Sequence, residues 1–108
     1  MIERRAEERV RVEVCVRLSG TDTRCERFSE SVLAANLSRS GALLTRVKAQ
    51  LRCGDLINVE YGRRQAQFRI VWVLDGASRE GTRVAIHKLE NQDCPWEAVL
   101  PLEEAVGR

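Results

Sequence analysis

Two groups of residues in this 108-residue chain have types and spacings suited to binding a nucleobase or a phosphate. Arg5 and Arg9 stand four positions apart, just before the first apolar stretch. A guanidinium donates two parallel hydrogen bonds, stacks on a base and pairs with a phosphate. Further along, residues 36–41 read Asn-Leu-Ser-Arg-Ser-Gly, which combines a carboxamide, hydroxyls and a glycine in one turn. Together these groups predict a ligand site shared by a charged tail and a turn.

The four cysteines and the single histidine do not indicate a metal site or a catalytic nucleophile. Cys15, Cys25, Cys53 and Cys94 form no closely spaced pair, and His87 is the single histidine. A structural zinc site needs four ligands, commonly in short pairs, and a catalytic cysteine needs a neighbouring base. We therefore expect no metal, no cofactor, no catalytic residue and no enzyme activity. The thiols are expected to be free and mostly buried.

The length and the net charge limit the classes of protein to which this chain can belong. The composition is 44% hydrophobic and 31% charged with a formal net charge of +2, which is typical of one globular domain. No apolar run approaches the ~20 residues of a membrane span, and the charged N-terminus lacks the apolar core of a secretory signal. We therefore expect a cytoplasmic protein with no membrane span. The near-neutral charge argues against nucleic acid as the partner.

The apolar pattern predicts six β-strands, because apolar and polar residues alternate with a period of two. The strands are expected at 10–18, 28–36, 42–45, 56–61, 66–74 and 81–89. One face of the fifth strand should carry Ala66, Phe68, Ile70, Trp72 and Leu74. Turn residues separate the strands, among them 19–22 and 62–64, and no strand–helix units alternate. The pattern favours an all-β fold, either a barrel or a sandwich.

The two ends of the chain differ from this pattern. Residues 1–9 are mostly charged, so we expect a mobile N-terminal arm, rich in arginine, that orders on ligand binding. Near the C-terminus, Pro101 prevents one uninterrupted helix, and a short helical segment is expected at about 96–100. Trp96 should plug or cover the barrel. The chain is thus divided into a switch segment, 1–9, and a barrel domain with a helical tail, 10–108.

The order of the two motifs resembles the bacterial PilZ family of cyclic di-GMP receptors. Its pattern is RxxxR in an N-terminal switch segment, matched here by Arg5 and Arg9. The second part is (D/N)xSxxG, matched by Asn36, Ser38 and Gly41. The resemblance covers nearly the whole chain. It implies a PilZ-like six-stranded antiparallel β-barrel and these five residues as ligand-binding residues.

The chemistry of the turn agrees with that assignment. The carboxamide of Asn36 can accept a hydrogen bond from the N–H edge of guanine, and Ser38 can reach the base or a phosphate. Gly41 permits close backbone approach or a positive φ. One departure lies at 84–87, where Val-Ala-Ile-His stands in place of the glycine and acidic residue that the family often has. Ligand contacts from the sixth strand are therefore not implied.

Arg4 is the residue from which we predict how many ligands bind to one chain. It directly precedes RxxxR, the position that tunes ligand number in the family. An arginine can stack on a second nucleotide, whereas a leucine would offer only apolar contact. We therefore expect Arg4 to join the ligand-binding residues and two cyclic di-GMP molecules to bind per chain.

The expected function is a receptor module that orders its arm over cyclic di-GMP and signals to a protein partner. Three alternatives stay open: a PilZ-fold protein–protein interaction adaptor that binds no nucleotide, an enzyme that uses a cysteine, and a single-stranded nucleic-acid binder. The 5% aromatic content gives few stacking platforms for a nucleic-acid strand. The sequence leaves the downstream partner, the pathway and the oligomeric state open.

Overall fold

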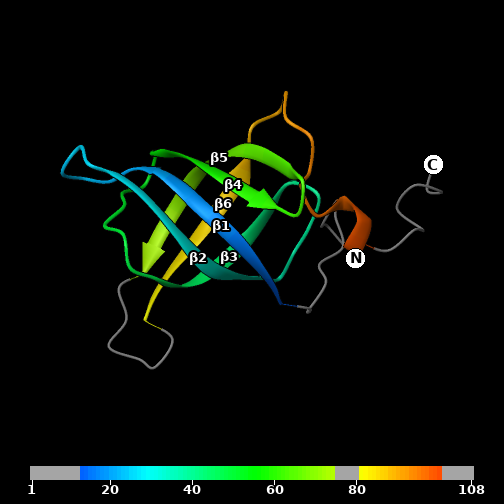
Figure 1. Cartoon of the computed structure of the whole chain (residues 1–108), viewed down its shortest axis with the longest axis horizontal. Helices are drawn as coiled ribbons and strands as arrows, with labels where there is room; N and C mark the ends of the chain where they lie inside the picture. The colour runs from blue at the N-terminus through cyan, green and yellow to red at the C-terminus, as the bar shows by residue number, and fades with distance from the viewer. Residues whose placement is uncertain (1–12, 75–80, 101–108) are drawn as a thin grey trace, which may run out of the picture.

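The computed structural model describes residues 13–74 and 81–100 and shows a closed barrel of six antiparallel strands (Figure 1). The strands are β1 (Val14–Thr21), β2 (Arg27–Ala35), β3 (Gly41–Val47), β4 (Leu56–Tyr61), β5 (Arg64–Leu74) and β6 (Thr82–Lys88). They are hydrogen-bonded in the order β1-β2-β3-β6-β5-β4, and β4 closes the barrel by pairing with β1. The prediction of an all-β, six-stranded antiparallel barrel is confirmed.

The first hairpin turns later than the sequence predicted. Residues 19–21 continue β1 and pair with β2, although a turn was expected at 19–22. The chain turns at Asp22, whose Oδ1 accepts hydrogen bonds from the backbone N–H groups of Arg24 and Glu26 at 2.9 and 3.0 Å. The expectation was wrong because residues 17–20 pair with strands on both sides, and these ladders outweigh the local turn propensity of serine and glycine.

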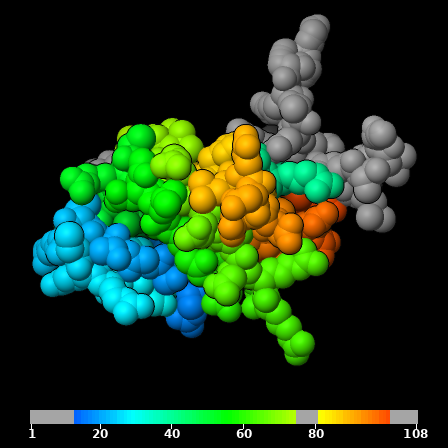
Figure 2. All heavy atoms as spheres, turned by 90° about the horizontal axis from the view of Figure 1, so that it is seen from above, coloured from blue at the N-terminus to red at the C-terminus, as the bar shows by residue number. Residues whose placement is uncertain are grey.

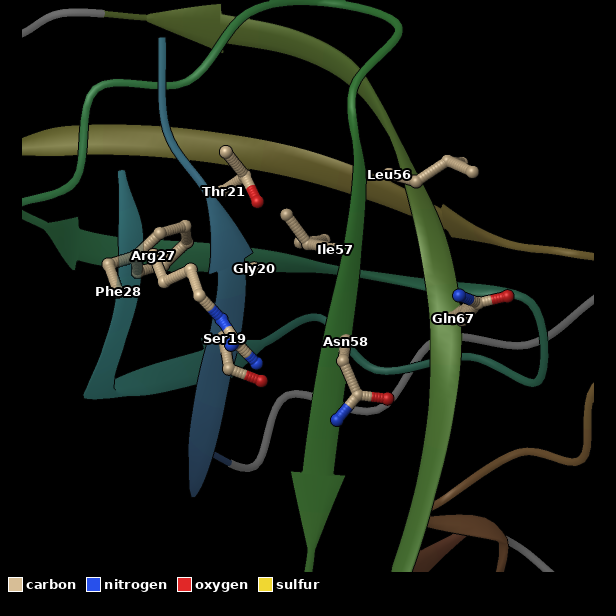
Figure 3. Close-up of a pocket in the computed structure, with 9 residues that line it drawn as sticks. All are labelled: Ser19, Gly20, Thr21, Arg27, Phe28, Leu56, Ile57, Asn58 and Gln67. Carbon is tan, nitrogen blue, oxygen red and sulfur yellow. The ribbon is translucent and has the colours of Figure 1, made fainter. Parts of the chain in front are cut away.

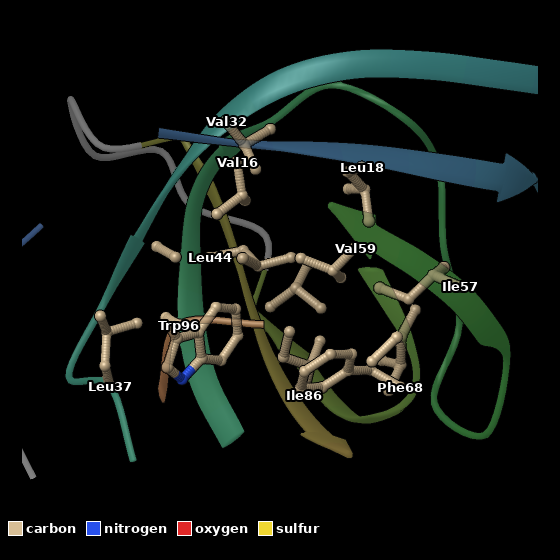
Figure 4. Close-up of a cluster of buried hydrophobic side chains, with 14 of the residues drawn as sticks. Val16, Leu18, Val32, Leu37, Leu44, Ile57, Val59, Phe68, Ile86 and Trp96 are labelled. Carbon is tan, nitrogen blue, oxygen red and sulfur yellow. The ribbon is translucent and has the colours of Figure 1, made fainter. Parts of the chain in front are cut away.

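Inward-facing side chains of all six strands fill the barrel (Figure 4). The fully or nearly fully buried apolar residues on the strands are Val16, Leu18, Val32, Ala34, Leu44, Val47, Ile57, Val59, Ala66, Phe68, Ile70, Val84 and Ile86. Trp96 follows the last strand, yet it is 0% exposed and its ring centroid lies 5.3 Å from that of Phe68. The prediction that Trp96 plugs the barrel is confirmed.

A β-bulge in β5 overturns part of the predicted face pattern. The pairing register with β6 shifts between Ile70 and Trp72, which makes Val71 an extra residue. Up to the bulge, alternate residues of 66–70 face the core as predicted. Beyond it, Trp72 and Leu74 lie outside, with 43% and 45% of their surface exposed. One inserted residue reverses the alternation of every residue that follows it, and the apolar sequence pattern gives no sign of the insertion.

The ends of the chain are only partly described. The C-terminal segment contains one turn of 3-10 helix, η1 (Glu97–Val99), and the short helical segment that the sequence predicted at about 96–100 is not confirmed beyond this turn. The expected switch segment, 1–9, lies outside the described residues. Within 13–74 and 81–100, no helix has the length and apolar character needed to cross a membrane.

Candidate ligand-binding turn

The turn at 36–41 joins β2 to β3 and lies against the C-terminal segment, where Figure 2 shows the two as neighbouring turquoise and orange surfaces. Asn36 is exposed and has a φ of 51°, in the left-handed region. Asparagine enters that region more readily than most residues, because its short side chain bonds to nearby backbone. The turn therefore presents the first residue of the motif on the surface, where a ligand can reach it.

Ser38 is buried, with 7% of its surface exposed, and its hydrogen bonds close the turn. Its backbone N–H donates to the carbonyl of Gly41 at 3.0 Å, and its Oγ accepts from the Gly41 N–H at 3.2 Å. The same Oγ lies 3.4 Å from the Gly41 carbonyl, to which it also donates. These bonds give Ser38 a structural role in the turn, and its contact with a ligand stays a prediction.

Gly41 is required by the close approach of β3 and β6. It pairs with His87, and a Cβ at position 41 would lie 2.5 Å from the carbonyl oxygen of Ile86. Its φ is not positive, so close approach is the relevant property of glycine here. Gly41 closely approaches the backbone of β6, which is part of the barrel.

The carbonyl of Ser38 fixes the turn to the C-terminal segment. Trp96 Nε1 donates a hydrogen bond to it at 2.8 Å, and Cys94 Sγ lies 4.0 Å away. Trp96 and Ser38 are both buried, so loss of this bond would leave a buried acceptor with only the long, weak hydrogen bond from the Cys94 thiol. The two residues are 58 positions apart, and no local pattern in the sequence could have predicted their contact.

A charged rim lies beside this anchor. The carboxylate of Glu97 is 3.3 Å from Arg39 Nη1 and 3.6 Å from Arg64 Nη1. All three side chains are 40–59% exposed, so these pairs contribute little to stability. Among residues 13–74 and 81–100, two guanidiniums thus share one carboxylate, and a guanidinium can also pair with a phosphate. The sequence analysis missed Arg39 and treated Arg64 as part of a turn, because only the tertiary fold brings these residues together.

The predicted arginines Arg4, Arg5 and Arg9 lie outside the described residues. The described chain shows where the first strand, β1, begins. Val14, the first residue of β1, pairs with Ala34, which is two positions before Asn36. The first described strand therefore begins beside the candidate turn.

A shallow pocket of about 330 Å³ lies elsewhere on the barrel, across the end of β1 and the start of β4 (Figure 3). Ser19, Asn58 and Gln67 contribute polar side chains, and Arg27 is the only charged residue among the described residues that line it. Such a surface can hydrogen-bond a small polar molecule. No residue of the 36–41 turn lines it, so it is separate from the candidate site.

The four cysteines are free, as predicted, but the expectation that most are buried was wrong. Cys15, Cys25 and Cys53 are exposed, because the first faces outward in the alternation of β1 and the other two lie in turns. Cys94 is buried, and its burial raises the pKa of its thiol. Within residues 13–74 and 81–100, no three histidine, cysteine, aspartate or glutamate side chains gather closely enough to hold a metal ion.

Comparisons with protein-family models, with curated proteins and with solved structures found no match. The resemblance to the PilZ family therefore rests on the motif residues and their order along the chain.

Proposed function

We propose that this chain is a cyclic di-GMP receptor module. One arrangement supports the proposal: the NxSxxG turn begins where β2 ends, and β1 begins beside that point through the pairing of Val14 with Ala34. Arg9 is five residues before Val14, and five residues span at most about 17 Å. The RxxxR segment is thus close enough in the chain to reach a ligand held at Asn36.

In this proposal the arm and the turn hold the nucleotide from opposite sides. Arg5 and Arg9 supply planar donors for guanine O6 and N7 or for the phosphates. Asn36 accepts from the guanine N–H edge, and the guanidinium of Arg39 pairs with a phosphate. Arg4 stacks on a second nucleotide, which gives two ligands per chain. Ordering of the arm then changes the surface that a downstream protein contacts.

Calorimetric titration of cyclic di-GMP into the full chain tests the proposal. We expect a dissociation constant in the micromolar range or tighter, roughly −8 kcal/mol, and much weaker binding of GTP and GMP. Arg5→Ala and Arg9→Ala should each cost on the order of 2 kcal/mol of binding without changing the melting temperature of the free protein. Arg63→Ala, in the exposed β4–β5 turn, is the matched control and should bind normally. Absence of heat from folded protein at high micromolar ligand would refute the proposal.

Asn36→Gly separates the side chain of Asn36 from its backbone conformation. Alanine would be strained at a φ of 51°, so Asn36→Ala would disturb the turn as well as remove the carboxamide. Glycine keeps the left-handed backbone and removes only the side chain. We expect weaker cyclic di-GMP binding with an unchanged urea midpoint. Unchanged affinity would exclude Asn36 as a ligand contact.

A second candidate is a protein–protein interaction adaptor that shares the fold but binds no nucleotide. The internal hydrogen bonds of Ser38 and the packing of Gly41 against β6 favour it, because they give both residues a purpose in the apo fold. The same titration distinguishes the two candidates. An adaptor gives no heat with cyclic di-GMP although the protein is folded.

A further inference from the structure

The carboxylate of Glu97 lies beside two guanidiniums that come from distant parts of the chain. Its Oε2 is 3.3 Å from Arg39 Nη1, and its Oε1 is 3.6 Å from Arg64 Nη1. Arg39 belongs to the 36–41 turn, Arg64 is the first residue of β5, and Glu97 is the first residue of η1. Each carboxylate oxygen thus faces one arginine, and the two arginines form a site that already holds an oxyanion group.

A buried anchor fixes the backbone beneath this charged cluster. Trp96 Nε1 donates a hydrogen bond to the Ser38 carbonyl at 2.8 Å, and both residues are buried. Glu97 is the next residue after this tryptophan, and Arg39 is the next residue after this serine. The anchor therefore keeps the two backbones side by side, and the ion pair can open by rotation of the side chains alone.

The ion pairs themselves are open to solvent. The side chains of Arg39, Arg64 and Glu97 are 40%, 59% and 48% exposed. Surface pairs of this kind are weak, and loss of one shifts an equilibrium by about fivefold at most. A guanidinium forms charge-assisted hydrogen bonds with a phosphate as it does with a carboxylate. A phosphate can therefore reach the two arginines and replace the carboxylate at a small cost.

We propose that Glu97 is an internal competitor for phosphate. In the structure its carboxylate occupies an oxyanion site made by Arg39 and Arg64, and a phosphate group displaces it from that site. The inference rests on the proposed function in one respect, because it takes this phosphate to belong to cyclic di-GMP bound at the 36–41 turn. Free inorganic phosphate has the same chemistry and competes with the carboxylate in the same way. Glu97 thus lowers the affinity of the site without contacting the ligand.

The first titration adds inorganic phosphate to the full chain at constant ionic strength and follows the Nε–Hε NMR signals of Arg39 and Arg64. Glu97→Gln removes the competing charge and keeps the side-chain size, so phosphate should bind about three- to fivefold more tightly than to the unmodified protein. Glu26→Gln is the matched control and should leave phosphate affinity unchanged. It makes the same change of net charge in the β1–β2 hairpin, at the opposite end of the barrel from η1 (Figure 1). Both glutamates are exposed, so both variants should keep the normal melting temperature.

Arg64→Gln distinguishes competition for the arginines from a general effect of negative charge. If Glu97 competes for Arg64, the two substitutions are coupled, and Glu97→Gln should tighten phosphate binding by less than about twofold in the Arg64→Gln background. A gain as large as in the presence of Arg64 would show that the carboxylate acts only through its charge. That result would overturn the proposal.

Calorimetric titration of cyclic di-GMP into the same variants connects the site to the proposed function. We expect Glu97→Gln to bind the nucleotide about three- to fivefold more tightly and Glu26→Gln to bind it normally. Tighter phosphate binding with unchanged nucleotide affinity would overturn the assignment of this site to the nucleotide.

Two further outcomes separate this inference from the proposed function. Equal affinity of all three proteins for phosphate and for cyclic di-GMP would overturn the inference and leave the proposed function intact. So would the absence of a saturable phosphate shift at Arg39 and Arg64 in Glu97→Gln up to tens of millimolar. Absence of heat with cyclic di-GMP in every variant would refute the proposed function, and the phosphate titration would then decide the role of Glu97 by itself.

Discussion

Replacement of Gly41 by alanine tests whether the motif glycine serves the fold or a ligand. The added Cβ would lie 2.5 Å from the carbonyl oxygen of Ile86, whereas ordinary contacts begin at 3.4 Å. The strands would have to separate by the difference, 3.4 − 2.5 = 0.9 Å, because the obstructing atom is backbone and cannot rotate away. The next backbone bond of this ladder, from Lys88 N–H to the carbonyl of Ser40, would be stretched by the same movement.

The expected cost combines two effects. Overpacking of a tight site costs about 1–3 kcal/mol, and a weakened interstrand hydrogen bond adds about 1 kcal/mol. Gly41→Ala should therefore lower the free energy of unfolding by about 2–4 kcal/mol. For a domain of this size, that corresponds to a fall in melting temperature of roughly 10–30 °C.

Urea denaturation followed by circular dichroism measures this cost. The urea midpoint should fall while the slope of the unfolding free energy against urea concentration stays constant. This combination indicates lower stability with the same surface exposed on unfolding. Ala42→Gly, at the next position of β3, is the control; it removes a Cβ where Gly41→Ala adds one and should cost about 1 kcal/mol. If Gly41→Ala is no more destabilising than Ala42→Gly, the steric reasoning is refuted. Normal stability with lost cyclic di-GMP binding would instead give Gly41 a direct role at the ligand.

Three further predictions concern the C-terminal anchor and the cysteines. Trp96→Phe keeps an aromatic plug but leaves the buried Ser38 carbonyl with only the weak Cys94 thiol donor, so the free energy of unfolding should fall by about 1–3 kcal/mol; an unchanged urea midpoint would show that the bond is dispensable. A thiol reagent should modify the three exposed cysteines of the native protein and spare Cys94 until it unfolds, as mass spectrometry can count. Burial raises the pKa of the Cys94 thiol, so the folded state favours the protonated thiol. The free energy of unfolding should therefore fall as pH rises above the ordinary thiol pKa. Cys94→Ala should lack this contribution to the loss of stability at alkaline pH.

The amino-acid sequence alone was enough to predict the strands and the class of fold. Alternation of apolar and polar residues located all six strands, because the two faces of a strand meet the core and the solvent in turn. Gly62 and Arg63 turned the chain where expected, since glycine accepts the positive φ of 63° found there. The candidate residues Asn36, Ser38 and Gly41 were also recognisable, because motif chemistry depends on residue type and short spacing.

The three-dimensional fold was needed to show which way side chains face after the β-bulge, and which residues far apart in the sequence are in contact. The bulge at Val71 turned Trp72 and Leu74 outward, and it exists only through the register of β5 against β6. The bond from Trp96 to Ser38 joins residues 58 positions apart. Periodicity records the environment of each residue along a strand, whereas register and closure are set by pairing between strands far apart in the chain. Contacts that depend on such pairing therefore cannot be predicted from the residues next to them in the sequence.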